Sequence, residues 1–458
     1  MPNRAAIVRL IAYFGLAMVW AAMTGRLQVH LVNDSPSYIN YPFDSLAESL
    51  LSIRPPVYPL FLKVVSLSVG LAAVPFLQLV LHTLASAFLG DELIARGLSV
   101  KSSMSVAITV LLGCTFNDNI NTISTDAPAA SMAVLVVAFL LRTYRSGTTS
   151  SAVGCIAAAI LCIFARPAYL FLIPWIAVAG WLLHRGDRER DLKLPSHRFR
   201  GGLISICVGA AVLCWMLTRL VFVNDFAILP FGHQNLSAVL AQLVTPDDMR
   251  SLSAEAEPRT AELLAEIASD LESRDFVLPT SELKTIPTLT LETQWGQINY
   301  GVIWPAAKRV QASIPVESTD VDARIQTHRL IGNFNRVILR SSPISYLKWI
   351  ALAGRRAVWG SMANVAMHPL FLIGIVGVCG WLIWIAASGQ SVGQFVISDG
   401  WYGFAMIAIS YFAFKVGFII LTSPPIGRFA DAAAILLPGL ATSFMFARTP
   451  TRPTEASS

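Results

Sequence analysis

Charged residues are scarce in this sequence. Asp, Glu, Lys and Arg make up 14% of its 458 residues, whereas hydrophobic residues make up 55%. A soluble domain carries about 25% charged residues, so a water-soluble chain of this size is not indicated. The mean hydropathy is +0.60, and apolar runs close to the roughly 20 residues that cross a bilayer recur along most of the chain. The sequence therefore predicts a protein that spans the membrane several times.

Metal-binding cysteine patterns, internal repeats and a nucleic-acid-binding surface are also missing. The six cysteines all lie in apolar stretches, none at a metal-ligand spacing flanked by histidine, and are read as small buried hydrophobic residues. The net charge is +6, but no basic stripe with interleaved aromatic residues accompanies it, so no nucleic-acid partner is expected. Neither a disulfide framework nor a zinc site is indicated.

The apolar runs predict an all-α polytopic protein with about ten transmembrane helices and both termini in the cytoplasm. The shorter run 57–69 suits a helix at the membrane interface better than a span. The segment 344–358, with basic and aromatic residues, is expected to lie in the interface as well. The expected spans are residues 5–23, 73–94, 105–115, 127–141, 152–164, 168–183, 203–223, 369–387, 402–421 and 429–446.

The basic residues of the short loops fall mostly on one side of this topology. Arg96 and Lys101 lie in one expected cytoplasmic loop, and Arg142 and Arg145 lie in the next. The basic run 184–200 and the C-terminal arginines follow on the same side. Lys and Arg collect in cytoplasmic loops, so the topology agrees with the charge distribution, and membrane lipids surround the body of the protein.

Residues 224–343 have the composition of a soluble domain and carry 15 of the 28 acidic residues. We call this segment the insertion domain and expect it to be extracytoplasmic and mixed or mainly helical. Leu263, Leu264, Ile267 and Leu271 recur at helical spacing, which predicts an amphipathic helix. The chain then divides into a transmembrane module, 1–223, with its first outer loop at 26–72, the insertion domain, a second module, 344–447, and a disordered cytoplasmic tail, 448–458.

Few acidic residues remain near the outer face outside the insertion domain. Asp34 is the first acid after the first expected span, in the run Asn-Asp-Ser-Pro-Ser-Tyr. A carboxylate at the mouth of a membrane cavity can act as a general base, but the same run also suits a helix N-cap. Both interpretations of Asp34 stay open at this point. Asp44, Glu48 and Asp126 are the other candidate acids on this side.

Four basic residues on the same side are candidates for binding a phosphate. Arg54 precedes two prolines that fix the start of a short apolar helix, and its guanidinium can hold a phosphate with two hydrogen bonds. Lys63, Arg166 and Arg428 interrupt or border apolar runs, where charge is costly and often functional. The alternatives are headgroup pairing for Arg54 and helix-orienting ion pairs for Arg166 and Arg428. His82, a lone histidine in an apolar span, is expected to be a packing residue.

These residues resemble the GT-C membrane glycosyltransferases, especially the protein O-mannosyltransferases and the lipid A aminoarabinose transferases. The pattern is an Asp with a nearby Tyr in the first outer loop, Asp34 and Tyr38, followed by Arg-Pro-Pro-Val-Tyr-Pro-Leu-Phe-Leu at 54–62, which includes Tyr58. Residues 121–126 resemble the acidic signature that opens a later span, and 423–429 resemble an Arg-Tyr signature before a late span. The insertion domain resembles no known family.

The resemblance implies an inverting transfer of sugar from a polyprenyl-phosphate donor to a glycan, lipid or protein acceptor. It implies an active site on the periplasmic or external face of the cytoplasmic membrane. Asp34 would be the base, basic residues would stabilise the leaving phosphate, and Tyr38, Tyr58, Asp44, Glu48 and Asp126 are substrate-binding candidates. Many relatives have two adjacent acids in the first loop, whereas Ser35 follows Asp34 here. Either one carboxylate suffices, or Asp44 or Glu48 supplies the second, which leaves the need for a divalent metal ion open.

Two other function classes compete with this one. A cell-envelope polysaccharide polymerase or ligase also joins lipid-linked sugars, but it lacks the first-loop Asp followed by an Arg-Pro-Pro helix. A non-catalytic transporter or scaffold is the second alternative. A transporter is expected to show paired halves with broken helices at matching positions, and the sequence has no such symmetry.

Overall fold

The computed structural model describes residues 4–113, 119–189, 200–280, 286–313, 321–388, 395–397, 399–446 and 448–450. Within these ranges the regular secondary structure is helical apart from one pair of three-residue strands. Strand β1 (Phe395–Ile397) pairs antiparallel with β2 (Arg448–Pro450). The all-α class expected from the apolar runs is confirmed.

Seven helical segments of the described residues are long and apolar enough to cross a membrane. The helices that form them are α1 (Arg4–Met23), α5 (Val74–Ala95), α8 (Asp126–Ser146), α10 (Leu172–Glu189), α11 (Arg200–Val223), α19 (Pro369–Ser388) and α20 (Asp399–Ile420). The short turns η1 (Leu71–Ala73) and η2 (Pro167–Tyr169) precede α5 and α10. These segments match seven of the ten expected spans, so the protein is an integral, multi-pass membrane protein.

The other three expected spans form shorter helices. Helices α6 (Val100–Leu111) and α9 (Thr149–Ala165) have 12 and 17 residues. The prediction of one continuous span at 429–446 is wrong, because the chain forms α21 (Gly427–Ala433) and α22 (Leu437–Phe446) there. Pro438, in the first turn of α22, has no backbone N–H to donate to the preceding turn, so it favours a new helix start over continuation.

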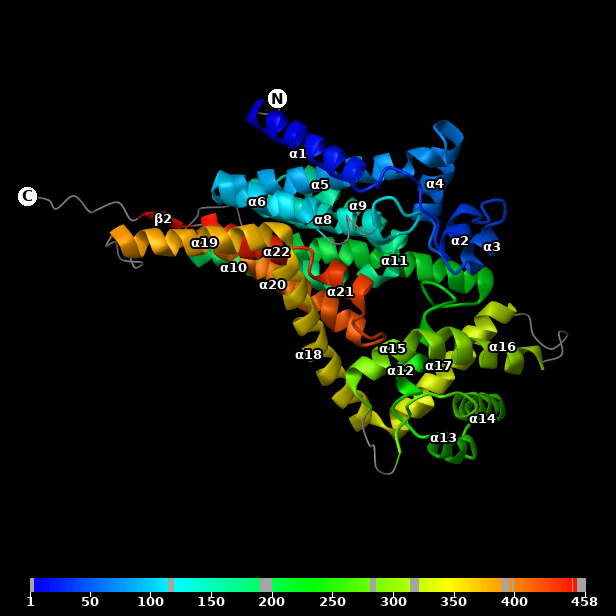
Figure 1. Ribbon diagram of the computed structural model, residues 1–458. Helices are drawn as coiled ribbons and strands as arrows, with labels where there is room; N and C mark the ends of the chain where they lie inside the picture. The colour runs from blue at the N-terminus through cyan, green and yellow to red at the C-terminus, as the bar shows by residue number, and fades with distance from the viewer. Residues whose placement is uncertain are drawn as a thin grey trace, which may run out of the picture.

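The regular secondary structure of the insertion domain is helical where it is described, and the domain lies beyond one end of the membrane helices (Figure 1). Leu263, Leu264, Ile267 and Leu271 are all fully buried, so the amphipathic helix predicted there is confirmed. Its elements are α12 (His233–Leu240), α13 (Pro246–Ser253), α14 (Pro258–Glu272), α15 (Thr288–Ile298), the π-helical η3 (Asn299–Ile303), α16 (Trp304–Ala312) and α17 (Ala323–Ser341).

Helix α18 (Pro343–Met367) joins the insertion domain to the membrane helices (Figure 1). The segment expected to lie in the interface forms the first part of this 25-residue helix. Trp349 of α18 and Ile420 of α20 belong to the same hydrophobic core as the leucines of α14. The insertion domain is therefore packed against the second membrane module and held in a defined position.

The first outer loop forms three short helices between α1 and η1. Helix α4 is the short apolar helix expected after the two prolines, and α2 begins directly after Asp34. The three helices of the loop are α2 (Ser35–Ile39), α3 (Leu46–Leu51) and α4 (Val57–Ser68).

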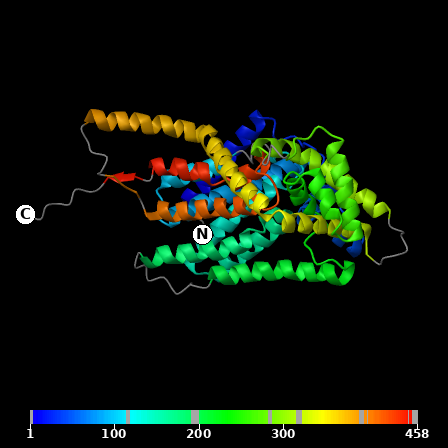
Figure 2. The ribbon, with the colours of Figure 1, turned by 90° about the horizontal axis from the view of Figure 1, so that it is seen from below.

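Seen from below, α10 and α11 run side by side along one side of the molecule (Figure 2).

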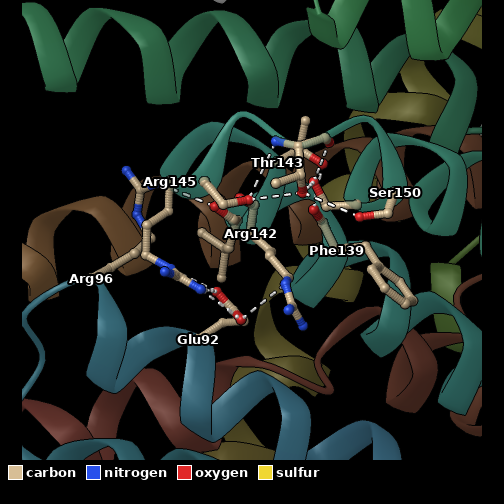
Figure 3. A network of polar contacts seen from close by, with 11 residues as sticks. Glu92, Arg96, Phe139, Arg142, Thr143, Arg145 and Ser150 are labelled. Carbon is tan, nitrogen blue, oxygen red and sulfur yellow. Dashed lines mark hydrogen bonds and ion pairs between the residues drawn. The ribbon is translucent and has the colours of Figure 1, made fainter. Parts of the chain in front are cut away.

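A buried carboxylate links α5 to α8 at the end of the membrane helices that is remote from the insertion domain (Figures 1 and 3). Glu92 is 4% exposed, and its two oxygens accept hydrogen bonds of 3.0 and 3.1 Å from Arg145. Nε of Arg142, one turn before Arg145 in α8, lies 3.8 Å from Oε1 of Glu92. The carboxylate thus fixes the relative position of the two helices, and its arginines lie at the end expected to face the cytoplasm.

Candidate functional site

A cavity of about 420 Å³ lies where the first outer loop, the end of α9 and the insertion domain meet. The first loop contributes charged and aromatic groups, and the insertion domain contributes aromatic and amide groups. Helix α9 ends early enough to place Arg166 at the cavity wall, as membrane helices do where they border a polar cavity. The lining residues are Asp34, Tyr38, Ile53, Arg54, Pro55, Thr125, Ala165, Arg166, Pro167, Ala168, Leu229, Phe231, Gly232, Gln234, Asn235, Trp295, Tyr300, Trp304 and Phe429.

Asp34 stands at the N-cap position of α2, but its side chain makes no capping hydrogen bond. Instead its Oδ1 lies 2.7 Å from Nη2 of Arg54. The same guanidinium donates to the Ser37 hydroxyl at 2.8 Å and to the Tyr38 hydroxyl at 3.0 Å. The capping role expected as an alternative is therefore not what the side chain does. Asp34 is 37% exposed at its side chain, so it is accessible from the cavity.

Tyr38 links the two arginines of the cavity through Thr125. Its hydroxyl lies 3.4 Å from Oγ1 of Thr125, which also accepts a hydrogen bond of 3.4 Å from Arg166. Tyr58 packs edge-on against the Tyr38 ring at 5.3 Å, and it is almost fully buried behind it. Tyr58 therefore supports the cavity wall and does not line the cavity itself.

Arg166 follows α9 in an extended conformation, with φ −149° and ψ 106°. The residue before a proline is restricted to such conformations, and Pro167 follows. Its guanidinium forms an ion pair with Asp126, the first residue of α8. Both side chains are largely buried, so the pair orients the ends of α8 and α9, which was the structural alternative for Arg166. The same arginine also lines the cavity, and the two roles are compatible.

The remaining site candidates lie elsewhere. Lys63 is exposed, does not line the cavity and places its ammonium 4.7 Å from the ring centroid of Phe43. Asp44 is exposed and outside the cavity. Glu48 pairs with Arg324 of the insertion domain at 3.0 Å. Arg428 belongs to α21, and its side chain lies outside the described part of the chain.

The metal ion considered with the sequence does not fit the side chains found here. Among the described residues, no group of three or more His, Cys, Asp or Glu side chains is arranged to hold a metal ion. Asp34 and Asp126, the two carboxylates nearest the cavity, each pair with an arginine. No catalytic step is therefore derived through a metal ion.

Two features of this region were missed in the sequence. Lys415 of α20 is 2% exposed, with its ammonium 3.2 Å from the ring centroid of Tyr169 and 3.5 Å from the carbonyl oxygen of Ala168, which lines the cavity. A lysine within an expected span was a signal that we overlooked. The second feature is the wall that the insertion domain contributes. The closely spaced aromatic residues Trp295, Tyr300 and Trp304 were the sequence signal for this wall. We considered mainly the acidic residues of the insertion domain and did not use that signal.

A stacked pair of histidines lies next to this wall. The rings of His233 and His328 are parallel, with centroids 3.7 Å apart, and Nδ1 of His233 donates to the backbone carbonyl of His328 at 3.0 Å. Burial, together with the positive charges of His233, Arg219 and Arg329, lowers the pKa of His328 to about 3. The imidazole of His328 is therefore neutral at physiological pH.

Two solved structures resemble the whole chain. The crystal structure of ArnT from Cupriavidus metallidurans in the apo state aligns with 97% of this chain and 76% of that chain, at 14% identity and a TM-score of 0.37. The structure of the same protein bound to undecaprenyl phosphate aligns with 95% of this chain and 76% of that chain, at 14% identity and a TM-score of 0.36. No protein-family model and no curated protein matches the sequence. At this identity and TM-score the similarity assigns neither a family nor an activity to the chain.

Proposed function

We propose that this protein is an inverting glycosyltransferase that moves a sugar from a polyprenyl-phosphate donor to an acceptor at the extracytoplasmic face of the membrane. The observation that supports this most is the cavity shared by Asp34, Arg54 and Arg166. It combines one accessible carboxylate with two permanent positive charges at the junction of the membrane helices and the insertion domain. A sugar phosphate offers the complementary groups.

In the proposed reaction Asp34 accepts the proton of the acceptor hydroxyl. The acceptor oxygen attacks the anomeric carbon from the face opposite the phosphate, and the bond between that carbon and the phosphate oxygen breaks. Polyprenyl phosphate leaves with the electron pair, and its developing negative charge is stabilised by Arg54 and Arg166. The proton stays on Asp34 until water removes it.

The ion pair between Asp34 and Arg54 would have to open during the proposed reaction. In the structure, Nη2 of Arg54 lies 2.7 Å from the Asp34 carboxylate. A bound phosphate would compete for the same guanidinium, because arginine binds phosphate with two charge-assisted hydrogen bonds. Asp34 would then be released to accept a proton at the moment when donor is present, which couples donor binding to base activity.

The test compares two aspartates of the first loop. Purified protein in lipid nanodiscs is given polyprenyl-phosphate sugars together with candidate glycan, lipid and protein acceptors, and the release of polyprenyl phosphate is followed by chromatography. Asp34→Asn should slow transfer by about 10²–10⁴-fold, the usual contribution of a general base. Asp44→Asn is the matched control, since Asp44 is exposed and outside the cavity, and it should transfer like the wild type. Near-normal transfer by Asp34→Asn would remove Asp34 from the mechanism.

A further inference from the structure

The cavity has two chemically different sides. Its charged lining residues, Asp34, Arg54 and Arg166, all come from the membrane body. The side that the insertion domain contributes has no charged side chain among the lining residues. We call this side the aromatic wall and define it by Phe231, Gln234, Asn235, Trp295, Tyr300 and Trp304.

Gln234 lines the cavity and carries a buried donor without a partner among the described residues. Its side chain is 1% exposed, and its Oε1 accepts a hydrogen bond of 2.9 Å from the Gly232 amide. Its Nε2 has no hydrogen-bond partner among the described residues. Burying an amide without a partner is costly, and such groups are rare in native proteins unless a ligand or water completes them. Because Gln234 lines the cavity, a hydroxyl of a bound ligand is a suitable acceptor.

Asn235 is held in place beside Gln234 by two neighbours. Its Oδ1 accepts a hydrogen bond of 2.8 Å from Asn299, and its backbone carbonyl accepts one of 3.0 Å from the Trp295 indole. Within the described part of the chain, the side-chain nitrogen of Asn235 donates no hydrogen bond. Asn299 and Trp295 therefore fix a second amide donor at the same wall.

The aromatic side chains come from an irregular helix. The π-helical segment Asn299–Ile303 separates α15 from α16 and sets the positions of Tyr300 and Trp304. Single π-helical turns are frequent at functional sites. Trp304 packs edge-on against Phe231 at 5.8 Å, while Tyr300 is 61% exposed at the mouth of the cavity. The wall thus offers flat apolar surfaces next to two amide donors.

We infer that the aromatic wall binds the acceptor and that the acceptor is a neutral carbohydrate. The role of the bound molecule as acceptor rests on the proposed function, whereas its carbohydrate nature rests on the chemistry of the wall. A sugar ring has an apolar C–H face, which packs on an aromatic ring, and a rim of hydroxyls, which accept from amide donors. An acceptor carrying phosphate or carboxylate groups would find no charged side chain among the lining residues of this wall. Lys308 places its ammonium 5.3 Å from the ring centroid of Trp304 but does not line the cavity. The donor phosphate belongs on the opposite side, with Arg54 and Arg166.

Binding tests the inference without any transfer reaction. Full-length protein in nanodiscs is applied to linear oligosaccharides of mannose, glucose, galactose, arabinose and N-acetylglucosamine, and to phosphorylated and uronic-acid counterparts. At least one neutral series should bind. Trp304→Ala should weaken that binding by about tenfold or more, as loss of a central aromatic contact does, and Gln234→Leu should also weaken it. Trp359→Ala is the matched control, because Trp359 is 71% exposed on α18, away from the cavity.

Three outcomes overturn the inference: no neutral oligosaccharide binds, only the charged counterparts bind, or Trp304→Ala binds as well as the wild type. Asp34→Asn separates this inference from the proposed function. That variant should bind the oligosaccharide normally while losing transfer. If oligosaccharides bind and no donor is ever consumed, the transferase proposal fails and the carbohydrate site stands. If transfer depends on Asp34 and its rate is the same in Trp304→Ala as in the wild type, only the carbohydrate site fails.

Discussion

Arg54 reaches across the first outer loop to hold Asp34, with Nη2 of the arginine 2.7 Å from Oδ1 of the aspartate. The two residues are separated by helices α2 and α3, and Arg54 also donates to Ser37 and Tyr38. One side chain therefore fixes the carboxylate, the start of α2 and an aromatic ring of the cavity at once. A lysine has the same charge but only a single ammonium, so it cannot make these contacts together.

Arg54→Lys should therefore lower kcat/KM for the donor by about 10- to 100-fold, the loss expected for one charge-assisted hydrogen bond. The effect should appear mainly in KM for the donor, because phosphate binding is weakened before the chemical step. Steady-state kinetics at varied donor concentration measure it. Equal donor kinetics in Arg54→Lys and the wild type would show that Arg54 does not contact the phosphate.

The Asp126–Arg166 pair predicts a stability effect that is separable from activity. Asp126→Asn leaves a largely buried arginine without its counter-charge, which costs about 3–5 kcal/mol in buried pairs. The double variant Asp126→Asn/Arg166→Gln should regain much of this stability, since neither charge remains, and it should still lack transfer. Thermal unfolding of the purified variants measures the stability. A double variant with normal transfer would contradict a role for Arg166 in binding the donor.

Glu92 predicts a change in stability without a change in catalysis (Figure 3). Glu92→Gln keeps the shape of the side chain but weakens its hydrogen bonds to Arg145. We expect a loss of about 1–3 kcal/mol in unfolding free energy and unaltered KM for the donor. Asp91→Asn is a useful comparison, because Asp91 on the same helix pairs with Arg9 instead. An altered donor KM in Glu92→Gln would connect this end of the protein to the cavity.

His328 predicts how stability depends on pH. Its pKa falls from the model-compound value of 6.5 to about 3 in the folded protein, so between these values the unfolded chain binds a proton that the folded chain does not. Stability is therefore fully present above pH 6.5 and falls as the pH drops towards 3. From pH 7 to pH 5 the loss is about 2 kcal/mol. His328→Gln should reduce the dependence by this amount, whereas His30→Gln, at an exposed position, should leave it unchanged. Some dependence should remain, because burial also lowers the pKa of His368.

The extracytoplasmic location of the insertion domain is tested by labelling. Ser273 is exposed in that domain, and Ser150 is exposed in the first turn of α9 at the opposite end. In intact cells an impermeant thiol reagent should modify Ser273→Cys and spare Ser150→Cys, with the wild type as background. After lysis both should react. The reverse pattern would invert the orientation of the whole protein and place the cavity at the cytoplasmic face.

The sequence alone determined the features that depend on composition and local spacing. Scarce charge and long apolar runs indicated a helical membrane protein, and the periodic leucines of α14 identified the core face of that helix. Asp34, Arg54 and Arg166 were selected because ionisable groups beside apolar runs are costly. The break at Pro438 was also visible in the sequence, and the expected span 429–446 ignored it. Hydrophobicity and proline effects act locally, so they can be read without a fold.

Only the tertiary structure decided which of these groups meet. Arg54 precedes α4 and Lys63 lies within it, yet Lys63 is exposed over Phe43 whereas Arg54 lines the cavity. Glu48 turned out to pair with Arg324, which is 276 residues away. The aromatic wall exists only because α18 and its core hold the insertion domain against the membrane helices. Contacts between segments far apart in the sequence depend on how whole helices pack, and no local pattern encodes that packing.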